Sequence, residues 1–349
     1  MRLSLSAPDA LLAALIFLFV QAGFTSSQAT GTIDDGPFPE DLNGSNFTYP
    51  YPVKLFRFAS QLHNLEMAFL DVPADPNTDT GKTAVLLHGK NFCAATWEGT
   101  IPVLTAAGFR VVVPDQIGFC KSTKLEEYQY SFHQLAWNTR GLLDTLGVGN
   151  VTVIGHSMGG MVGTRFALQH PDSVDQLVLV NAIGLEDYIA QGVPYIGIEQ
   201  TVATETASNY TTIRRYQQQI YYLGEWRDEY DRWVNMSVNI YHGSQREAFI
   251  GGQARVVDMV LTQPIAPHFA ALKSRTVLMI GEKDRTAIGS AWAPPAVAER
   301  LGRYDELGPK ILSQLRDGDL VVFPEYGHSP HISHPEEFHK ALLKQLQAS

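Results

Sequence analysis

The sequence predicts an α/β fold, in which a mostly parallel sheet of about eight strands carries helices on both faces. Short apolar runs recur along the chain, and segments with helical periodicity lie between most of them, as at 131–147 and 158–170. Strands that are apolar on both faces and alternate with helices are typical of a parallel sheet covered on both sides. The runs are TAVLLHG (83–89), FRVVVPD (109–115), VTVIGHS (151–157), QLVLVNA (176–182), TVLMIGEKD (276–284) and DLVVFPEYGH (319–328).

Two further strands are expected before these runs. VKLFRFAS (53–60) and LEMAFLDV (65–72) have the residue types of strands, and we expect them to form a hairpin joined near His63 and Asn64. Residues 30–50 are rich in glycine, proline, aspartate and asparagine, so we expect an irregular lead-in there.

One interval breaks the alternation of strands and helices. From 184 to 270 the sequence shows no clear central strand, which predicts a mostly helical insertion, because a structureless loop of this length is uncommon in a compact domain. We expect this insertion to be a lid over a pocket, on a core made of residues 30–183 and 271–349. For any single ring, packing within the insertion's own small core is the simpler explanation. Its aromatic residues include Tyr188, Tyr195, Tyr210, Tyr216, Tyr221, Tyr222, Trp226, Tyr230, Trp233 and Tyr241.

Composition and charge limit the classes of partner. Of the 349 residues, 45% are hydrophobic and 18% charged, which is typical of a globular protein. The formal net charge of −10 argues against nucleic acid or an anionic membrane surface as the main partner. A small-molecule substrate fits this composition better than either.

The N-terminus has the features of a secretory signal peptide. Arg2 precedes the apolar run LLAALIFLFV (11–20), which is too short to span a bilayer comfortably, and Ser27-Gln28-Ala29 offers the small residues that signal peptidase reads. We expect residues 1–29 to be removed, leaving a secreted protein (extracellular, in the secretory pathway, or periplasmic in a bacterium) with no stable membrane span. An uncleaved membrane anchor is the alternative, because Asp9 and the single basic residue make the n-region weak.

Sequons and cysteines fit that compartment. Asn-X-Ser/Thr triplets occur at five positions, but Asn150 opens a strand that should be buried. The two cysteines, Cys93 and Cys120, are compatible with one disulfide in an oxidising compartment or with two buried thiols. The remaining glycosylation candidates are Asn43, Asn46, Asn209 and Asn235.

A glycine-rich turn after the strand at 151–156 carries a serine, in the form Gly155-His156-Ser157-Met158-Gly159 followed by Gly160. A sharp strand-to-helix turn needs minimal side chains two residues before and two residues after its centre, and the glycines supply them. Such a turn exposes the serine Oγ at the carboxyl end of a parallel sheet, where ligands bind. It also puts the Met158 N–H at the start of a helix, where it can stabilise an oxyanion. Ser157 is therefore the predicted nucleophile.

The ends of two later strands offer an acid and a base. Asp284 ends TVLMIGEKD and His328 follows DLVVFPEYG, so each lies at the carboxyl end of its own strand, and we predict a Ser157–Asp284–His328 triad. No competitor combines a strand end with this chain order as well. The competitors are Glu282 and Asp115 for the acid, and His88, His133, His170, His331 and His334 for the base.

The second oxyanion donor is expected in the loop after AVLLHG. His88-Gly89 closes that strand, and the next backbone N–H groups are those of Lys90, our first choice, and Asn91. A metal site is not expected at the late histidines, because no carboxylate or thiol lies at a matching spacing and two prolines interrupt them. Those histidines are His328, His331, His334 and His339.

In these motifs the chain resembles serine hydrolases of the α/β-hydrolase superfamily. It is most similar to the lid-bearing branch that contains epoxide hydrolases, haloalkane dehalogenases, haloperoxidase-like esterases and carbon–carbon bond hydrolases. The resemblance implies an α/β-hydrolase fold with a helical lid, and it covers nearly all of the chain from about residue 50. The motifs that carry it are His88-Gly89, Asp115-Gln116-Ile117-Gly118, Gly155-His156-Ser157-Met158-Gly159, Gly281-Glu282-Lys283-Asp284 and Gly327-His328.

Departures from the family narrow the expected chemistry. Epoxide hydrolases and haloalkane dehalogenases use an aspartate where this chain has Ser157. Carbon–carbon hydrolases usually carry more glycine and a proline after the His-Gly pair, whereas this chain reads HGKNFCAATW. In DQIGFCKS, Cys120 stands where the family commonly has glycine, so Cys93 and Cys120 follow two neighbouring strands at one edge of the sheet. Their loops can meet beside the active site, which favours a disulfide that would stiffen the oxyanion loop.

The predicted reaction is acyl transfer to water. Ser157 attacks a carbonyl, His328 acts as general base, and Asp284 orients the imidazole. An acidic protein with an aromatic-rich lid favours an apolar or neutral ester, lactone or thioester, with no metal or organic cofactor. Two alternatives remain: an acyltransferase or carbon–carbon bond hydrolase in a small-molecule biosynthetic pathway, and a binding protein or receptor with a lidded pocket and little turnover.

Overall fold

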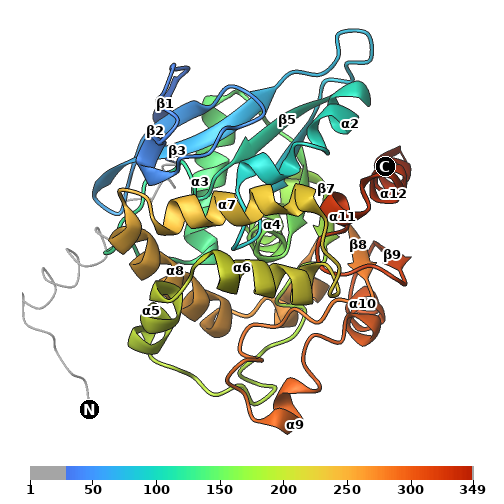
Figure 1. Cartoon of the computed structure of the whole chain (residues 1–349). Helices are drawn as coiled ribbons and strands as arrows, with labels where there is room; N and C mark the ends of the chain where they lie inside the picture. Colours follow the sequence, from blue (N-terminus) through green and yellow to red (C-terminus); the bar gives the residue numbers. More distant parts are fainter. Residues whose placement is uncertain (1–28, 348–349) are drawn as a thin grey trace, which may run out of the picture.

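The structure is a computed structural model that describes residues 29–347. Apart from Ala29, the predicted signal peptide lies outside these residues. Nine strands form one sheet, in the order β1-β2-β3-β5-β4-β6-β7-β8-β9 (Figure 1). The strands are β1 (Gly31–Asp34), β2 (Lys54–Ser60), β3 (His63–Val72), β4 (Lys82–Leu87), β5 (Phe109–Pro114), β6 (Val151–His156), β7 (Val174–Val180), β8 (Arg275–Gly281) and β9 (Gly318–Phe323).

The sheet is antiparallel at one edge and parallel elsewhere. β1 pairs with β2, β2 with β3, and β3 with β5 in antiparallel fashion, and the pairs from β5 across to β9 are parallel. The predicted α/β class is confirmed. In the β2–β3 hairpin, Ser60 pairs with His63, so the turn lies at Gln61 and Leu62, slightly before the expected position. Both turn residues have positive φ (49° and 67°), as a tight two-residue hairpin turn requires.

The expected irregular lead-in contains the ninth strand. Residues 31–34 pair with β2, from Gly31 opposite Phe58 to Asp34 opposite Leu55. A Cβ on Gly31 would lie 2.4 Å from the ring of Phe56, so a glycine leaves room for the aromatic side chain of the neighbouring strand. Its four residues, Gly-Thr-Ile-Asp, are too short and too polar to show a strand pattern, which is why the sequence did not predict this strand.

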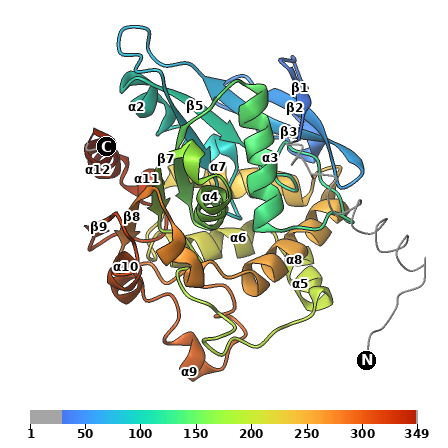
Figure 2. The same cartoon turned by 180° about the vertical axis from the view of Figure 1, so that it is seen from behind.

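Helices cover both faces of the sheet, because side chains of the parallel strands alternate between two hydrophobic clusters. Leu87 of β4 and Val153 of β6 belong to the cluster with α3, α4 and α10, whereas Leu86 and Ile154 belong to the cluster with α2 and α12. Figure 2 labels these helices around the sheet. The helices outside the insertion are η1 (Leu42–Gly44), η2 (Ala94–Trp97), α2 (Ile101–Ala106), α3 (Phe132–Thr145), α4 (Met158–Gln169), η3 (Pro171–Ser173), α9 (Pro295–Ala298), α10 (Tyr304–Leu312), α11 (Pro330–Ser333) and α12 (Pro335–Gln347). The short helix η6 (Ala266–Ala271) lies where the insertion rejoins the core.

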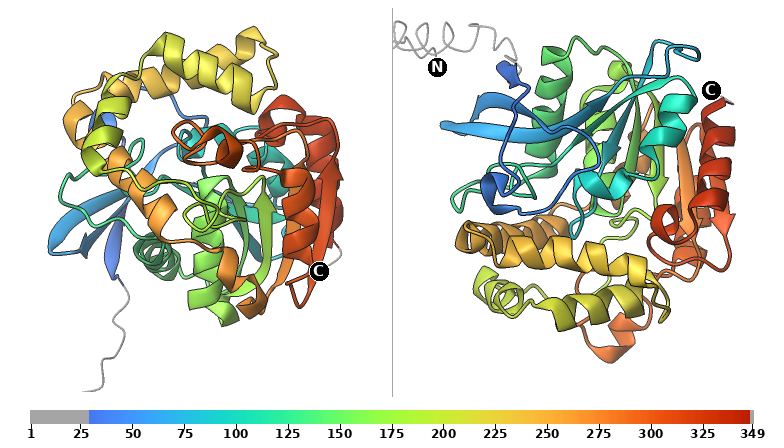
Figure 3. Two further views of the ribbon diagram at one scale, coloured as in Figure 1. Left: turned by 90° about the horizontal axis from the view of Figure 1, so that it is seen from below. Right: turned by 45° about the horizontal axis from the view of Figure 1, so that its top comes forward.

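The insertion between β7 and β8 forms a helical layer at one end of the sheet (Figure 3). Within it α5 packs against α8 and α6 packs against α7. We refer to residues 184–270 as the lid. Its helices are α5 (Ile198–Thr206), α6 (Tyr210–Tyr216), the π-helix η4 (Gln217–Tyr221), the short 3₁₀-helix η5 (Asp228–Tyr230), α7 (Asp231–Tyr241) and α8 (Arg246–Thr262). In the described part of the chain, no helix combines the length and the apolar character that crossing a membrane would need.

The loops after β4 and β5 are joined by the predicted disulfide. Cys93 and Cys120 are bonded, with Cα atoms 5.8 Å apart and a separation of 27 positions in the sequence. By the loop-entropy estimate, closing a loop of this length contributes about 3–4 kcal/mol of stability. The buried Asp115 carboxylate strengthens the junction: Oδ1 accepts a hydrogen bond from the Ala94 N–H (2.7 Å) and Oδ2 one from the Lys121 N–H (3.1 Å). Asp115 therefore organises loops and is not the acid of a triad.

Two buried histidines lie in α11 and α12. The His331 ring contacts Trp97 (centroids 4.7 Å apart), and burial lowers the pKa of His331 to about 3. His339 Nε2 and Thr100 Oγ1 are hydrogen-bonded at 3.0 Å, and burial lowers the pKa of His339 to about 4. Both imidazoles are therefore neutral in the folded protein at pH 5–7, whereas a histidine of the unfolded chain takes up a proton below about pH 6.5.

These histidines predict loss of stability in mild acid. Between pH 6.5 and pH 3 the unfolded chain binds more protons than the folded chain, so the free energy of unfolding falls as pH falls. For His331 alone the loss from pH 7 to pH 5 is about 2 kcal/mol. Urea denaturation of the wild type and His331→Gln at both pH values should show a smaller loss in the variant. The exposed His242 provides the control His242→Gln; equal losses in the wild type and His331→Gln would contradict the prediction.

Candidate active site

The serine turn has the geometry that its glycines predict. β6 ends at His156 and α4 begins at Met158, and Ser157 between them has φ 55° and ψ −122°, a left-handed conformation that costs energy for a residue with a Cβ. A Cβ on Gly155 would lie 2.4 Å from the Gly159 oxygen, and one on Gly159 would lie 2.1 Å from the Leu87 oxygen. Larger residues at either position would force the turn open.

The predicted base and acid are in contact. His328 follows β9 and Asp284 follows β8, and His328 Nδ1 lies 2.7 Å from Asp284 Oδ2 with both side chains fully buried. His156, the residue before Ser157, places this pair beside the turn, because its Nε2 lies 2.8 Å from the His328 backbone oxygen. His328 Nε2 is buried and has no hydrogen-bond partner within residues 29–347. The nitrogen that would accept a proton from a nucleophile is thus left open.

Three hydrogen-bond donors orient the Asp284 carboxylate. Besides His328, the Asn181 Nδ2 group donates to Oδ2 (2.9 Å) and the Thr286 N–H donates to Oδ1 (2.8 Å). Asn181 is buried at the end of β7, and its Oδ1 accepts a hydrogen bond from the Gly281 N–H (3.1 Å). Sequence analysis did not identify Asn181, although an asparagine at the carboxyl end of a buried strand was a usable signal.

Neighbouring histidines keep the site in place without carrying charge. Burial lowers the pKa of His156 well below its usual value, and His331 and His328 nearby add to the shift. The rings of His156 and His331 are 4.5 Å apart. A neutral His156 with its proton on Nε2 donates to the His328 backbone, so it is a structural partner of the base. The rival acid Glu282 has no contact with His328 among the described residues.

The loop after β4, residues 88–92, passes over Ser157 and is called the oxyanion loop here. A Cβ on Gly89 would lie 2.9 Å from the Ser157 Cβ. His88 Nδ1 donates to the Gly89 oxygen (2.8 Å), while its Nε2 accepts a hydrogen bond from the Gln116 N–H (3.0 Å). Burial lowers the pKa of His88, which matches this neutral, doubly bonded imidazole. The competitor His88 therefore shapes the loop.

The predicted oxyanion donors flank the nucleophile. Met158 is the first residue of α4, where the N–H has no partner within the helix. The other two candidates, Lys90 and Asn91, have side chains that reach the lid. Lys90 Nζ lies 2.7 Å from Glu205 Oε1, and Asn91 Nδ2 donates to the Tyr221 hydroxyl (2.7 Å). Use of the Lys90 or Asn91 backbone N–H as an oxyanion donor stays a prediction.

The lid covers the site in this structure. Ser157 is 5% exposed, and Phe92 and Tyr221, which lie above it in the oxyanion loop and the lid, are 2% and 3% exposed. The Tyr221 ring stacks on the ring of His328, with centroids 4.8 Å apart. Ser157 is therefore nearly inaccessible to solvent in this structure.

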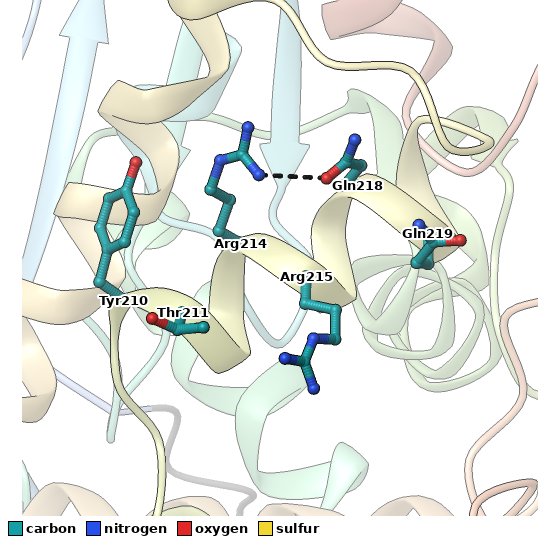
Figure 4. A pocket seen from close by; sticks show the side chains of 6 residues that line it. All are labelled: Tyr210, Thr211, Arg214, Arg215, Gln218 and Gln219. Atoms are coloured by element: carbon teal, nitrogen blue, oxygen red, sulfur yellow. Dashed lines mark hydrogen bonds between the residues drawn. The ribbon is translucent and has the colours of Figure 1, made fainter.

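The other histidines and a hollow on the lid lie outside this constellation. The His334 ring stacks on Tyr326, with centroids 3.8 Å apart. A hollow of about 590 Å³ on the outside of α6 contains no residue of the triad or oxyanion loop (Figure 4). Its lining residues are Tyr210, Thr211, Arg214, Arg215, Gln218 and Gln219.

The described residues include one close group of potential metal ligands, made of Cys93, Asp115 and Cys120. Its two sulfur atoms are joined to each other, and the carboxylate accepts backbone hydrogen bonds. A bonded disulfide offers no thiolate to a metal, so the group does not fit a metal site.

Comparison with known proteins agrees with this geometry. The α/β-hydrolase fold family model matches residues 83–335. The solved structure of a probable hydrolytic enzyme from Pseudomonas aeruginosa PAO1 has a TM-score of 0.85 and 49% identity, covering 89% of this chain and 99% of that one. An esterase from Exiguobacterium antarcticum has a TM-score of 0.65 and 19% identity, covering 81% of this chain and 96% of that one, and so supports the fold.

A curated relative extends the comparison to a named reaction. The 2-hydroxy-6-oxo-6-phenylhexa-2,4-dienoate hydrolase of Burkholderia cepacia is 26% identical over 277 residues, covering 76% of this chain and 88% of that enzyme. The family match, the likeness to solved structures and the geometry at Ser157 agree with one another. The chain belongs to the α/β-hydrolase fold family and is a hydrolase of that fold.

Proposed function

We propose that the protein is a serine hydrolase that cleaves an apolar or neutral small-molecule ester, lactone or thioester through an acyl-serine intermediate. The observation that carries this proposal is the hydrogen bonding of the two ring nitrogens of His328. Its Nδ1 is bonded to the oriented Asp284 carboxylate, and its buried Nε2 has no hydrogen-bond partner among the described residues. Its backbone oxygen is bonded to His156, the residue before Ser157. An oriented Nδ1 and a free Nε2 are two of the features that a general base for a serine nucleophile requires.

The reaction follows from these positions. Ser157 Oγ attacks the substrate carbonyl as its proton passes to His328 Nε2, and Asp284 stabilises the imidazolium. The Met158 and Lys90 N–H groups bind the oxyanion, and the leaving group departs with the proton from His328. Water then gives a proton to His328 as its hydroxide adds to the acyl carbon. The bond from that carbon to Ser157 Oγ breaks, His328 returns the proton to Oγ, and the acid is released.

The surroundings support an uncharged substrate. Phe92 and Tyr221 present aromatic surface next to the triad, and Phe92 packs in a cluster with lid tyrosines. The one cation of the oxyanion loop, Lys90, is paired with Glu205, so the pair adds no net charge to the site. An apolar wall with few polar groups favours apolar or neutral ligands.

Carbon–carbon bond hydrolysis is the second candidate. It is favoured by the 26% identity to the 2-hydroxy-6-oxo-6-phenylhexa-2,4-dienoate hydrolase over most of both chains. The sequence HGKNFC after β4 departs from the glycine- and proline-rich loop of such enzymes. A panel that contains esters, lactones and a vinylogous 1,5-diketone acid distinguishes the two reactions.

Labelling by a fluorophosphonate probe tests the nucleophile. The wild type should be labelled, and Ser157→Ala should lose both labelling and turnover, with kcat lower by about 10⁴-fold or more because no other group takes the acyl. Ser237→Ala, a buried serine in α7, is the matched control and should behave as the wild type. Labelling that persists in Ser157→Ala, or none in folded wild type, would rule out the proposal.

Replacement of Asn181 tests the support of the acid. Asn181→Ala removes one donor from Asp284, so kcat should fall about 10- to 100-fold, the expected loss for one hydrogen bond to a charged group, while KM changes little. Asn138→Ala removes an equally buried asparagine of α3 and controls for general destabilisation. An unchanged kcat in Asn181→Ala would show that the other two donors suffice.

We also propose that the protein is secreted, supported by the apolar run at 11–20 and by a disulfide, which is typical of oxidising compartments. N-terminal sequencing of the protein from its native source should begin at Thr30; a chain that keeps residues 1–29 would contradict this. Mass spectrometry of the same sample tests glycosylation. Asn46, Asn209 and Asn235 are exposed, whereas Asn43 is half-buried and donates to the Lys121 oxygen (2.9 Å), so a glycan is least expected there.

A further inference from the structure

We propose that Tyr221 of the lid is a positioning residue: its ring holds the His328 imidazole and the oxyanion loop in their working arrangement when the lid is closed. The proposal rests on the proposed function, since the step that it supports is the one His328 performs. It singles out one ring among the aromatic residues of the lid, which sequence analysis could not separate from one another.

The Tyr221 ring contacts both loops that flank Ser157. Its centroid is 4.8 Å from that of His328 with an interplanar angle of 26°, and 5.4 Å from that of Phe92 with an angle of 29°. Both contacts are stacked arrangements. One side chain of the lid therefore bears on the predicted base and on the loop that offers an oxyanion donor.

The phenol group fixes the ring in this position. The Tyr221 hydroxyl accepts a hydrogen bond from Asn91 Nδ2 at 2.7 Å, so the far end of the side chain is tied to the oxyanion loop. Burial raises the pKa of Tyr221 well above its usual value, so the phenol stays neutral. Tyr221 is thus a stacking and hydrogen-bonding group rather than a proton donor in the reaction.

The backbone delivers Tyr221 to the site by an irregular route. Tyr221 is the last residue of the π-helix η4, a type of distortion that is often found at functional sites. Leu223 and Gly224 then turn the chain with φ values of 56° and 88°. A Cβ on Gly327, the residue before His328, would lie 2.7 Å from the Tyr221 backbone oxygen. The lid backbone therefore also packs directly against the loop that carries His328.

The adjacent tyrosine shows that these contacts are specific to one position. Tyr222 stacks on Tyr230 with centroids 3.8 Å apart, and its edge meets Trp226. This trio belongs to a small hydrophobic cluster that also includes Tyr221 and Phe92, but the Tyr222 ring packs on the lid side of it. Tyr222 and Tyr221 are therefore equally buried neighbours, one with a structural role and one facing the triad.

The stack restricts a tilt of the His328 ring that the hydrogen bond to Asp284 does not prevent. Asp284 holds Nδ1 of His328, but the ring can still tilt about that hydrogen bond, and the tilt decides whether Nε2 faces Ser157 Oγ. A flat ring on the imidazole face limits the tilt and keeps water from that face. Since misplacement of a catalytic group by about 1 Å can cost a large part of the rate, loss of the ring should lower kcat with little effect on KM.

Kinetics of three variants test this role. Tyr221→Leu removes the aromatic face but keeps an apolar side chain, and kcat should fall about tenfold, the amount that corresponds to the loss of an aromatic pair, with KM within about twofold. Tyr221→Phe keeps both stacks and should restore kcat to within about threefold of wild type. Tyr222→Leu disturbs the same hydrophobic cluster without removing the ring that stacks on His328, and should leave kcat close to wild type.

Nuclear magnetic resonance provides a readout that does not depend on turnover. A ring stacked on His328 shifts the imidazole Cε1–H resonance, which is assigned by its loss in His328→Gln. We expect this resonance to move in Tyr221→Leu and to stay in place in Tyr221→Phe and Tyr222→Leu. Thermal unfolding of each variant shows that the comparison is made between folded proteins.

Several results would overturn the proposal. They are an unchanged kcat in Tyr221→Leu, a rise in KM alone, an equal loss in Tyr221→Phe, or an equal loss in Tyr222→Leu. If the wild type is not labelled by a fluorophosphonate and hydrolyses no ester or lactone, the proposed function fails instead. The imidazole resonance then decides the positioning role by itself: a resonance that does not move in Tyr221→Leu overturns it.

Discussion

The close approach of separate backbone segments at Ser157 is the constraint on which the rest of the site depends. The Gly159 position leaves no room for a side chain against the end of β4. The Ser157 N–H donates to the oxygen of Val180, the last residue of β7 (3.1 Å), and the Ser157 oxygen accepts from the Ile183 N–H just beyond that strand (3.2 Å). The turn is therefore locked between two neighbouring strand ends. The oxyanion loop and Asn181 start from those ends, so their places follow from the same packing.

Features with a local or periodic cause could be predicted from the sequence. The parallel strands are apolar on both faces, and the turn at Ser157 needs glycines at fixed offsets, so both leave a direct mark on the chain. Asp284 and His328 could be found because a parallel sheet brings strand ends to one edge, and the structure places them in contact. The prediction of the disulfide depended on the order of the strands in the sheet, and the family resemblance supplied that order.

Features with a long-range cause could not be predicted in this way. β1 is a strand because it pairs with the edge of β2, and its four residues show no hydrophobic alternation that would predict a strand. The role of Asn181 exists only because β7 and β8 are neighbours in the sheet. Tyr221 and Tyr222 are identical residues in adjacent positions, and the π-helix that sends one to His328 and the other to Tyr230 is set by packing between the lid and the core.

The disulfide has a consequence for any movement of the lid relative to the core. The Cys93–Cys120 disulfide and the Asp115 hydrogen bonds tie the end of the oxyanion loop to the loop after β5, so the core holds it in place independently of the lid. An outward movement of the lid would separate Lys90 from Glu205 and Asn91 from Tyr221. It would expose both members of the Lys90–Glu205 pair to water, and closure would remove that water again. Such a movement would be sensitive to dissolved ions, even for a substrate that bears no charge.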